Sequence, residues 1–527
     1  MFAVNPSLIA KIDAYAKEQL AIPTHTLMQR AGEAIFSYVQ TKLCKKNARI
    51  LILCGGGNNG GDGYAAGRLL LEHGHLVTAV DLFSCGQRTE EGKRALRAFE
   101  ETPDARLLHG AEGLAKALEK VDCVIEAVYG VGARADLPEE AVLVLSALGQ
   151  LREERVNKKQ TPPLFVAVDC PLGVNVLDGT AREDAFAFDA TVELSFPKLG
   201  THSYPAARYA GEFVLDTLGL PTDLIKDNFD LQNIIMDGET ASKMMPHRDA
   251  EGHKGSFGTL GAVIGSAQYR GAALLAAESA LRGGIGLLRY FGEREVCTAL
   301  LARNPEAVCH PISPVAQMCK GDAAAFVSDS PKVSAWLIGS GCGQSEGLAH
   351  LLSAFLTSEG APLVLDADAL NLLADESYAL LGLLADCKRQ VLLTPHPLEF
   401  ARLCRLTANE VQNNRLSLAR DFAARYGVTL LLKGKGSVTA SPDGRVCVNS
   451  SGNTALSKGG SGDVLAGLVA SLAAQGVTLF DAAALGAYLH GRAGEELSKT
   501  LGEAGTLPSD LPMAIARLNL PSCPTTL

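Results

Sequence analysis

The stretch of the sequence that most clearly suggests chemistry is Gly55–Gly63, which reads Gly-Gly-Gly-Asn-Asn-Gly-Gly-Asp-Gly. It follows an apolar run, Ile50–Cys54, and precedes Tyr64–His73, which has the pattern of a short helix. A glycine-rich loop between a strand and a helix lets backbone amides approach an anion, and the helix dipole favours negative charge there. The sequence therefore predicts a loop that binds the phosphates of a nucleotide. Asn58 and Asn59 add side-chain oxygens that could coordinate a cation.

Three carboxylates follow apolar runs in the same half of the chain. Asp62 comes after the first run, and Glu126 and Asp169 come after two later ones. Ligands of open parallel sheets bind at the carboxyl ends of the strands, so we expect these three groups to converge. Each could instead cap a turn or a helix, but the loop Gly130–Gly132 directly after Glu126 favours a site. A carboxylate facing a nucleotide could act as a general base or balance the charge of a cation.

In the second half, the run Gly459–Gly462 precedes an apolar helix expected over Val464–Ala474. The free amides at the start of such a helix can hold a phosphate. Asp463 is then in the first turn, where it could take a proton from a substrate hydroxyl while amides stabilise a transferring phosphoryl group. The alternative is that Asp463 only caps the helix, but the glycine-rich run beside it favours the catalytic interpretation.

Two further segments of the second half suggest ligand contacts. Lys433–Ser437 could wrap around a second phosphate, although an exposed turn would have a similar sequence. His396 lies between Pro395 and Pro397, which restrict the backbone and so aim the imidazole ring. A structural histidine is the alternative there.

The elements that must position these residues alternate between strands and helices. In the first half we expect strands at Ile50–Cys54, Leu76–Phe83, Val121–Ile125 and Leu164–Val168, with helices at Tyr64–His73 and Glu139–Leu151. In the second half we expect strands at Thr259–Ile264, Leu287–Phe291, Ala335–Ile338, Pro362–Leu365, Gln390–Leu393 and Val428–Leu432, and helices at Ala272–Arg282, Val464–Ala474 and Asp481–Leu497. Such alternation predicts parallel sheets with helices on both faces, an α/β fold. We expect one domain over residues 1–222 and a second over residues 230–527.

The composition narrows the class of protein. A chain of 527 residues is too long for one ordinary core, and 47% apolar with 20% charged residues is typical of a soluble globular protein. A net charge of −10 argues against a nucleic-acid surface. Thirteen scattered cysteines without a Cys-x-x-Cys pair are expected to be buried thiols in a reducing cytoplasm. We expect no membrane span, because no run of about 18 apolar residues occurs.

The order of motifs in the first half resembles the NAD(P)H-hydrate epimerase family. These motifs are Leu27–Gly32, Gly55–Gly63, Gly130–Leu137, Asp169–Gly173 and Thr191–Gly200, and the resemblance covers most of residues 1–220. It implies a Rossmann-like three-layer αβα domain, with Asp169 at the hydrated ring. It also implies that the following residues bind the hydrated dinucleotide: Asn58, Asn59, Gly60, Gly61, Asp62, Gly130, Val131, Gly132, Ala133, Arg134, Ala135 and Asp136.

The same resemblance implies a potassium ion near Asn59, Glu126 and Leu172. Two of these positions depart from the family's pattern. The family usually has Asp where this chain has Glu126, which lengthens the side chain by one methylene group. It usually has Ser where this chain has Leu172, so that only the carbonyl oxygen of Leu172 could contact potassium.

The motifs of the second half are similar to those of the ADP-dependent NAD(P)H-hydrate dehydratases, a family with a ribokinase-like α/β fold. They are His253–Gly258, Tyr269–Ala272, Asp366–Asn371, Thr394–Glu399, Lys433–Ser437 and Asn449–Asp463. The resemblance implies that Ala272, Gly341, His396 and Asp463 contact the hydrate. It implies that the adenine nucleotide is bound by Lys433, Gly434, Lys435, Gly436, Ser437 and Gly462.

The two resemblances together imply a fused repair enzyme for hydrated NADH and NADPH. The first domain would interconvert the R and S hydrates, with potassium bound, and the second would dehydrate the S form with ADP and Mg²⁺, releasing AMP and phosphate. Asp169 and Asp463 are the expected catalytic residues, and we expect a homo-oligomer. Two alternatives stay open: a ribokinase-type small-molecule kinase, and a first domain that binds nucleotide without catalysis, which the apolar Leu172 leaves possible.

Overall fold

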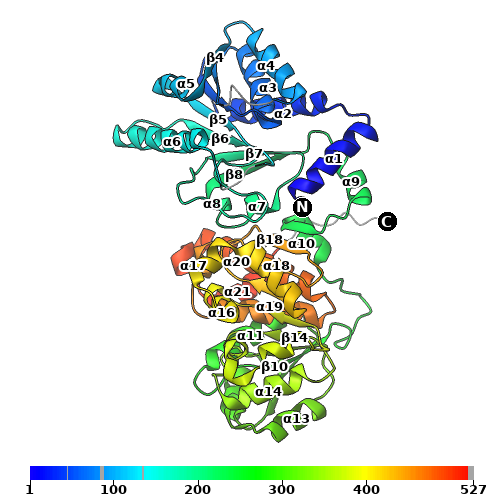
Figure 1. Ribbon diagram of the computed structural model, residues 1–527. Helices are drawn as coiled ribbons and strands as arrows, with labels where there is room; N and C mark the ends of the chain where they lie inside the picture. The colour runs from blue at the N-terminus through cyan, green and yellow to red at the C-terminus, as the bar shows by residue number, and fades with distance from the viewer. Residues whose placement is uncertain (44, 83–87, 133–135, 520–527) are drawn as a thin grey trace. The chain divides into compact units, whose positions relative to one another are not determined.

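The computed structural model describes residues 1–43, 45–82, 88–132 and 136–519 of the chain. These residues form two compact units, Phe2–Asn233 and Ile234–Leu527. Both units are α/β, as the alternation of apolar runs predicts, and each is built around its own sheet (Figure 1).

The sheet of the first unit has seven strands in the order β4-β3-β2-β5-β6-β7-β8, all parallel. Its strands are β2 Arg49–Cys54, β3 Leu76–Asp81, β4 Arg106–His109, β5 Cys123–Ala127, β6 Leu164–Val168, β7 Ala190–Leu194 and β8 Glu212–Asp216. Nearly every residue of the central strands is buried, which is why they read as short continuous apolar runs. All the carboxyl ends therefore lie at one edge.

Helices cover both faces of this sheet and give three layers (Figure 1). Ile50 and Ile52 of β2 pack against one set of helices, and Leu51 and Leu53 pack against the other, because successive strand residues point to opposite faces. The first set comprises α1 Pro6–Glu18, α2 Thr24–Lys42, α3 Asn58–Glu72 and α4 Glu90–Glu100, and the second comprises α5 Gly110–Ala117 and α6 Glu139–Asn157. Three short helices complete the unit: α7 Leu199–His202, α8 Ala207–Ala210 and α9 Thr222–Asn228.

Helix α3 corrects the expected extent of the glycine-rich loop. The helix begins at Asn58 rather than Tyr64, so that only Gly55–Gly57 precede it and the remaining glycines lie inside its first turns. Packing explains these glycines: a Cβ atom at Gly60 would lie 2.1 Å from the Gly55 carbonyl oxygen, and one at Gly63 would lie 2.8 Å from the Ala127 Cβ. The glycines bring α3 close to the sheet, and its first turn lies at the carboxyl edge.

The sheet of the second unit is mixed. Its strands β9 to β18 lie in the order β9-β18-β17-β16-β15-β14-β13-β10-β11-β12. The strands from β16 to β12 are parallel to one another, whereas β17 pairs antiparallel with both β16 and β18. Their bounds are β9 Asn233–Met236, β10 Thr259–Val263, β11 Leu287–Gly292, β12 Val308–Pro311, β13 Ala335–Ile338, β14 Leu363–Leu365, β15 Val391–Leu393, β16 Thr429–Leu432, β17 Val438–Ala440 and β18 Val446–Asn449. The sequence did not predict the antiparallel strands, which connect β16 to the last helices. The fold is ribokinase-like.

Helices also cover both faces of the second sheet. One face packs against α11 Arg270–Arg282, α19 Ser461–Ala474 and α20 Leu479–Gly505. On the other face, Trp336 of β13 contacts Phe355 of α14 Glu346–Leu356. The remaining helices are α10 Gly238–Met244, α12 Arg294–Arg303, α13 Lys320–Asp329, α15 Asp368–Ala374, α16 Pro397–Cys404, α17 Ala408–Asn413, α18 Arg415–Tyr426 and α21 Leu511–Ala516.

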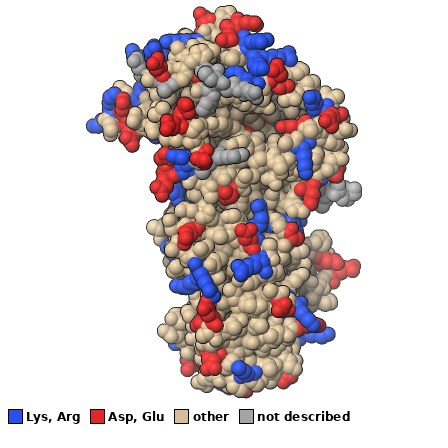
Figure 2. Space-filling model, viewed as in Figure 1, with Lys and Arg blue, Asp and Glu red and all other residues tan. Residues whose placement is uncertain are grey.

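The surface carries charges of both signs. Figure 2 shows basic and acidic side chains interspersed over the visible face of each unit. Among the described residues, no helix is long and apolar enough to cross a membrane.

We predict that Gly60→Ala destabilises the first unit by about 1–3 kcal/mol, because the new Cβ would overlap the Gly55 carbonyl oxygen. Gly57→Ala is the matched control: no atom lies within 4 Å of its Cβ position, and we expect a loss of less than about 1 kcal/mol. Circular dichroism during denaturant unfolding measures both. The single tryptophan, Trp336, reports on the second unit and should give an unchanged transition. Equal losses in the two variants would contradict the packing argument.

Candidate functional sites

A cavity of about 390 Å³ opens at the carboxyl edge of the first sheet. It brings together seven residues that the sequence assigned to a dinucleotide site, namely Asn58, Asn59, Asp62, Gly130, Val131, Gly132 and Asp169. They come from the start of α3, the segment after β5 and the segment after β6. The expected convergence at this edge is therefore present in the structure.

Asp169 is held in place by a buried lysine. Its backbone adopts a left-handed conformation with φ of 67°, which is uncommon for a residue with a Cβ. The Oδ1 atom accepts a hydrogen bond from the Lys198 ammonium, and the Leu194 N–H donates to the same oxygen at 3.3 Å. Lys198 is 1% exposed and also donates to the Leu194 carbonyl at 2.7 Å. One carboxylate oxygen is thus fixed by two donors.

Two other carboxylates line the same cavity. Burial raises the pKa of Asp62 well above its usual range, and the neighbouring Asp169 raises it further while Lys198 opposes the shift. Burial also raises the pKa of Asp13, a residue of α1. The charge of Lys198 lowers this pKa, and the charge of Asp169 raises it. The cavity therefore combines a fixed ion pair with two carboxyl groups whose pKa values are raised.

The expected potassium ligands lie partly beneath the cavity. Glu126 was expected after a strand, but β5 extends to Ala127, so Glu126 lies within it and is fully buried. Its Oε1 accepts from the Val128 N–H at 2.8 Å, and its Oε2 accepts from the Leu172 N–H at 3.0 Å. Burial raises the pKa of Glu126 to about 8 against these hydrogen bonds. The Leu172 side chain packs in the core.

Asn59 has the clearest unmet hydrogen-bonding capacity in this region. Its amide nitrogen donates to the Val168 carbonyl at 3.2 Å. Among the described residues, its Oδ1 atom is buried and has no hydrogen-bond partner. A buried acceptor without a partner is unfavourable, so this oxygen is suited to a cation or a substrate donor.

Some described residues expected at this site do not line the cavity. Gly60 packs on the Gly55 carbonyl, and a Cβ at Gly61 would lie 2.5 Å from the Met28 side chain, so both serve helix packing. Asp136 is exposed. Ala133, Arg134 and Ala135 fall outside the described residues.

In the second unit, Asp463 lies in the first turn of α19, as predicted. Gly460 precedes the helix with φ of 99°, and no side chain caps the helix start. Its first amides are therefore available to an anion. Burial raises the pKa of Asp463 to about 6, with Asp366 adding to the shift and Lys433 opposing it. A carboxyl group with this pKa is ionised at neutral pH and can still accept a proton.

Lys433 and Asp366 form a buried ion pair beside this helix. The Lys433 ammonium donates to Asp366 Oδ1 at 2.9 Å and lies 3.4 Å from the Cβ position of Gly462. Burial alone would lower the Lys433 pKa, but Asp366 and Glu399 raise it. Asp366 also accepts from the Thr394 and Ser340 hydroxyls at 2.7 and 3.0 Å. The ammonium is therefore fixed next to the amides of α19.

The segment Lys433–Ser437 forms the turn between β16 and β17. Its glycines Gly434 and Gly436 have φ of 135° and 59°, conformations that favour glycine. The Lys435 ammonium donates to the Gly452 carbonyl at 2.8 Å, and the Ser437 hydroxyl donates to the Gly434 carbonyl at 3.0 Å. Two of the expected nucleotide ligands thus shape the turn through their side chains.

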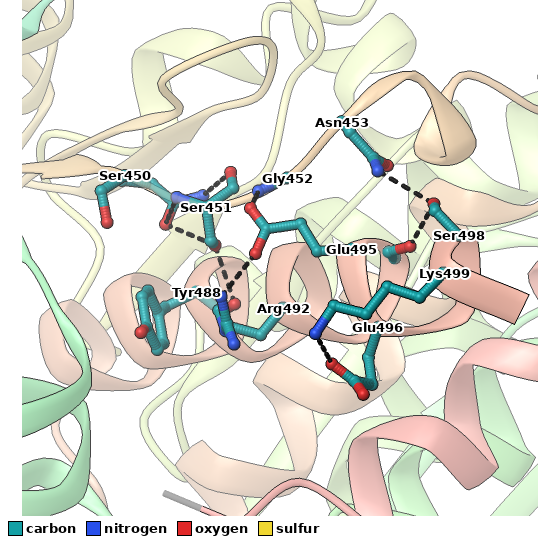
Figure 3. Close-up of polar contacts among 12 residues, drawn as sticks. Ser450, Ser451, Gly452, Asn453, Tyr488, Arg492, Glu495, Glu496, Ser498 and Lys499 are labelled. Carbon is teal, nitrogen blue, oxygen red and sulfur yellow. Dashed lines mark hydrogen bonds and ion pairs between the residues drawn. The ribbon is translucent and has the colours of Figure 1, made fainter. Parts of the chain in front are cut away.

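Figure 3 shows how the facing loop, Ser450–Asn453, is anchored on α20. The Gly452 N–H donates to Glu495 at 2.7 Å, and Arg492 pairs with the other oxygen of the same carboxylate. The Asn453 amide donates to the Ser498 hydroxyl at 2.9 Å. Because Lys435 contacts the carbonyl of Gly452, the turn and this loop are held together.

His396 caps α16 with its ring. The Nδ1 atom accepts from the N–H groups of Leu398 and Glu399 at 3.1 and 3.2 Å, so that the proton of the neutral ring is on Nε2. Burial lowers the His396 pKa, and Lys433 and Arg402 lower it further. His396 is therefore a helix cap, and its Nε2 atom, which carries the remaining N–H, lies 3.3 Å from Glu399 Oε1.

The last two expected contacts, Ala272 and Gly341, are adjacent. A Cβ at Gly341, where φ is 66°, would lie 2.7 Å from the Ala272 Cβ. A small residue at each position leaves room beside the start of α11 for a ligand.

Comparisons with known proteins identify the family of both units. Residues 24–200 match the family model described as YjeF-related protein N-terminus, and residues 260–517 match the model described as NAD(P)H-hydrate dehydratase. The chain is 33% identical to the bifunctional NAD(P)H-hydrate repair enzyme Nnr of Moorella thermoacetica, over 97% of this chain and 95% of that protein. This chain belongs to the bifunctional NAD(P)H-hydrate repair enzyme family. The resemblance seen in the motifs is confirmed.

Two other relatives extend the comparison. The repair enzyme of Escherichia coli is 32% identical over 95% of this chain and 91% of that protein. The solved ADP/ATP-dependent NAD(P)H-hydrate dehydratase of Bacillus subtilis, co-crystallised with ATP and Mg²⁺, is 31% identical. It covers 54% of this chain and 96% of that protein, with a TM-score of 0.46.

Sequence reasoning missed several residues at the two sites of this repair enzyme. Lys198 and Asp13 line the first cavity, and only Lys198 belongs to a motif used for the resemblance. Arg415, 1% exposed, donates to the Leu432 and Lys433 carbonyls and so supports the nucleotide turn. His490, whose Nε2 lies 3.2 Å from the Ser461 hydroxyl, supports the start of α19. Each reaches the site from a distant part of the chain.

We predict that His490 destabilises the folded chain as the pH falls. Burial lowers its pKa from 6.5 to about 4, so between these values the unfolded state binds the proton more readily. The free energy of unfolding should therefore fall by up to about 3 kcal/mol as the pH drops from 6.5 to 4. Denaturant unfolding followed by Trp336 fluorescence should show this component in the wild type and lack it in His490→Gln. His247→Gln, at an exposed histidine, is the matched control; an identical pH slope in both variants would contradict the assignment.

Proposed function

We propose that the two units of this NAD(P)H-hydrate repair enzyme catalyse separate steps of one repair. The first unit interconverts the R and S hydrates of NADH and NADPH, and the second dehydrates the S hydrate with ADP, releasing AMP and phosphate. The observation that carries the proposal is Asp463, in the first turn of an uncapped helix and next to the Lys433–Asp366 pair. A base beside an anion site is what phosphoryl transfer to a hydroxyl group requires.

Asp463 is the proposed base of the second unit. It takes the proton of the ring hydroxyl while the oxygen attacks the β-phosphoryl group of ADP, and AMP leaves. The resulting phosphate ester is a better leaving group than hydroxide, so loss of phosphate together with a proton from the neighbouring carbon restores the double bond. Ala272, Gly341 and His396 contact the hydrate, and the His396 Nε2–H donates to it.

The adenine nucleotide is bound by the glycine turn and the helix start. The amides of Lys433–Ser437 and of Gly462 hold its phosphates, and the Lys433 ammonium supplies the positive charge. Mg²⁺ offsets the remaining phosphate charge. Among the described residues, no group of three His, Cys, Asp or Glu side chains could hold a metal, so the phosphates themselves would supply ligands to Mg²⁺.

In the first unit, Asp169 acts at the hydrated ring, and Asn58, Asp62 and Gly130–Gly132 bind the dinucleotide. The glycine at position 130 leaves room there, because a Cβ would lie 3.0 Å from Asp169 Oδ2. We propose the remaining residues of these segments, Gly60, Gly61, Asp136 and Ala133–Ala135, as further contacts of the dinucleotide.

Potassium is proposed at Asn59, Glu126 and Leu172. The unpartnered Asn59 Oδ1 fits a cation, and the buried carboxyl of Glu126 has no cationic partner among its described contacts. Leu172 contributes only its backbone. The ion would supply positive charge that favours the ionised form of Glu126.

The buried thiols support a reducing cytoplasm as the compartment of this enzyme. Apolar side chains exposed on α6, Leu143 and Val156, support assembly into a homo-oligomer.

We predict that Asp463→Asn abolishes dehydration, by at least about 1,000-fold, because the base is lost while the side chain keeps its size. Asp169→Asn should abolish only epimer exchange. Recovery of the near-ultraviolet absorbance of NADH from its hydrate, with ADP and Mg²⁺, measures dehydration. With mixed epimers, the Asp169→Asn variant should stop when the S form is exhausted.

The pH dependence provides the control for this assignment. Asp463 is protonated below about pH 6, so wild-type dehydration should fall as the pH drops through that value. Loss of both activities in either variant would contradict separate sites. Phosphorylation of an alcohol without recovery of NADH would favour a small-molecule kinase instead.

We predict that potassium speeds epimer exchange and leaves dehydration of pure S hydrate unchanged. Replacing K⁺ with tetramethylammonium should slow the exchange, and Asn59→Leu should remove the response because it deletes the unpartnered oxygen. Asn228→Leu, on α9, is the matched control. An exchange rate independent of K⁺ in the wild type would contradict the site.

A further inference from the structure

Lys198 is a buried charged residue of the first unit that the sequence did not assign to the site. It lines the proposed epimerase cavity, is 1% exposed, and places its ammonium between Asp169 Oδ1 and the Leu194 carbonyl. Removing an ammonium group from water is unfavourable, and a buried ion pair is weak evidence for stability alone. Its position against the proposed catalytic carboxylate therefore points to a role at the reacting ring.

The two oxygens of Asp169 have different surroundings. Oδ1 is fixed by Lys198 and by the Leu194 N–H. Oδ2 lies above Gly130, 3.0 Å from where a Cβ would be, and only glycine leaves that space open. The left-handed backbone of Asp169 sets this orientation. Oδ2 is thus the oxygen available to a substrate in the cavity.

Asp62 provides a second carboxyl group, which differs from Asp169 in its surroundings. It projects from the first turns of α3 into the same cavity. Burial and the charge of Asp169 raise its pKa well above the usual range. Of the two carboxyl groups in this cavity, one is paired with a lysine and the other holds its proton more tightly than an exposed carboxyl group, so they can serve as base and acid.

The other titratable groups around Asp169 do not take over the role of Lys198 or of Asp62. Asp13, from α1, is the third carboxyl group of the cavity, and burial raises its pKa too. Glu193 contacts the His202 ring at 2.7 Å, and its negative charge raises the pKa of Lys198. Burial raises the pKa of the Cys170 thiol well above its usual range, so that it stays neutral.

We propose that Lys198 orients Asp169 as the base of epimer exchange, and that Asp62 is the acid of the same step. This inference rests on the proposed epimerase function. Lys198 is a positioning residue, since it acts through Asp169, whereas Asp169 and Asp62 exchange protons with the substrate.

The step is balanced within the substrate and these two groups. Water adds to the ring next to nitrogen, so the hydrate carries its hydroxyl on a carbon bonded to the ring nitrogen. Asp169 takes the hydroxyl proton, the carbon–oxygen double bond forms, and the carbon–nitrogen bond breaks as Asp62 protonates the nitrogen. Rotation of the resulting aldehyde and closure on its other face, with both protons returned, give the opposite epimer.

Ring opening fits a repair enzyme better than loss of the hydroxyl group. Loss of hydroxide would create the ring cation from which water addition to NADH also proceeds, so the enzyme would catalyse the damage. Ring opening keeps the carbon–oxygen bond, and the nitrogen is a good leaving group because its electrons delocalise into the carboxamide.

The test uses the full-length chain without ADP, so that the second unit is inactive and exchange between purified R and S hydrates is followed alone. Lys198→Met should lower kcat about 100-fold and change KM little, because the Asp169 carboxylate loses the donor that orients it. Lys198→Arg keeps a donor and a positive charge and should restore most of the lost kcat. Asp62→Asn should lower the rate about 100-fold, and Asp223→Asn, on the exposed α9, is its matched control.

The outcomes separate this inference from the proposed function. A wild-type chain that does not interconvert the epimers would overturn the epimerase function itself. An active wild type with near-normal kcat in Lys198→Met, or near-normal exchange in Asp62→Asn, would overturn the acid–base pair. If Lys198→Met does not fold, as its thermal unfolding would show, Asp62→Asn and Lys198→Arg decide. Exchange in isotopically labelled water should leave the substrate oxygen unlabelled, and one labelled oxygen per exchange would overturn the ring-opening step.

Discussion

A buried lysine–carboxylate pair at the carboxyl edge of a sheet is the interaction on which both sites depend. Lys198 contacts Asp169 in the first unit, and Lys433 contacts Asp366 in the second. Neither ammonium could stay charged in these positions without its partner, because removing an ion from water is costly. The parallel sheets supply the geometry, since all their strands end at one edge and bring distant side chains together there.

The two pairs are used differently. Lys433 is bonded to Asp366 and acts on Asp463 only through space, which holds the Asp463 pKa near 6 against a larger shift from burial. The proposed base of the second unit is therefore ionised at pH 7 without a direct ion pair, and its side-chain hydrogen bond is with Ser340. In the first unit the lysine contacts the proposed base itself, leaving a single free oxygen.

The sequence predicts the elements better than the contacts between them. Asp463 could be placed because a glycine run, an apolar helix and the residue itself are adjacent in the chain. The start of α3 could not be predicted, because its glycines suggest a loop. They serve close packing against the sheet, which is seen only in the assembled fold. Glu126 was expected beyond its strand for a similar reason: β5 is extended by pairing with β2, and a carboxylate within a strand breaks the apolar pattern.

Contacts between residues distant in sequence were beyond prediction for a general reason. Asp169 and Lys198 are separated by a strand and two loops, and no periodicity relates them. A lysine that ends in the core also has the same sequence signal as one at the surface. What the sequence does contain is a requirement for charge balance, since a carboxylate expected inside a cavity implies a buried cation or a raised pKa. The first unit meets this requirement in both ways, with Lys198 beside Asp169 and a raised pKa at Asp62. Both solutions in one cavity are what proton transfer in two directions needs, because an epimerase must work equally from either face of its substrate.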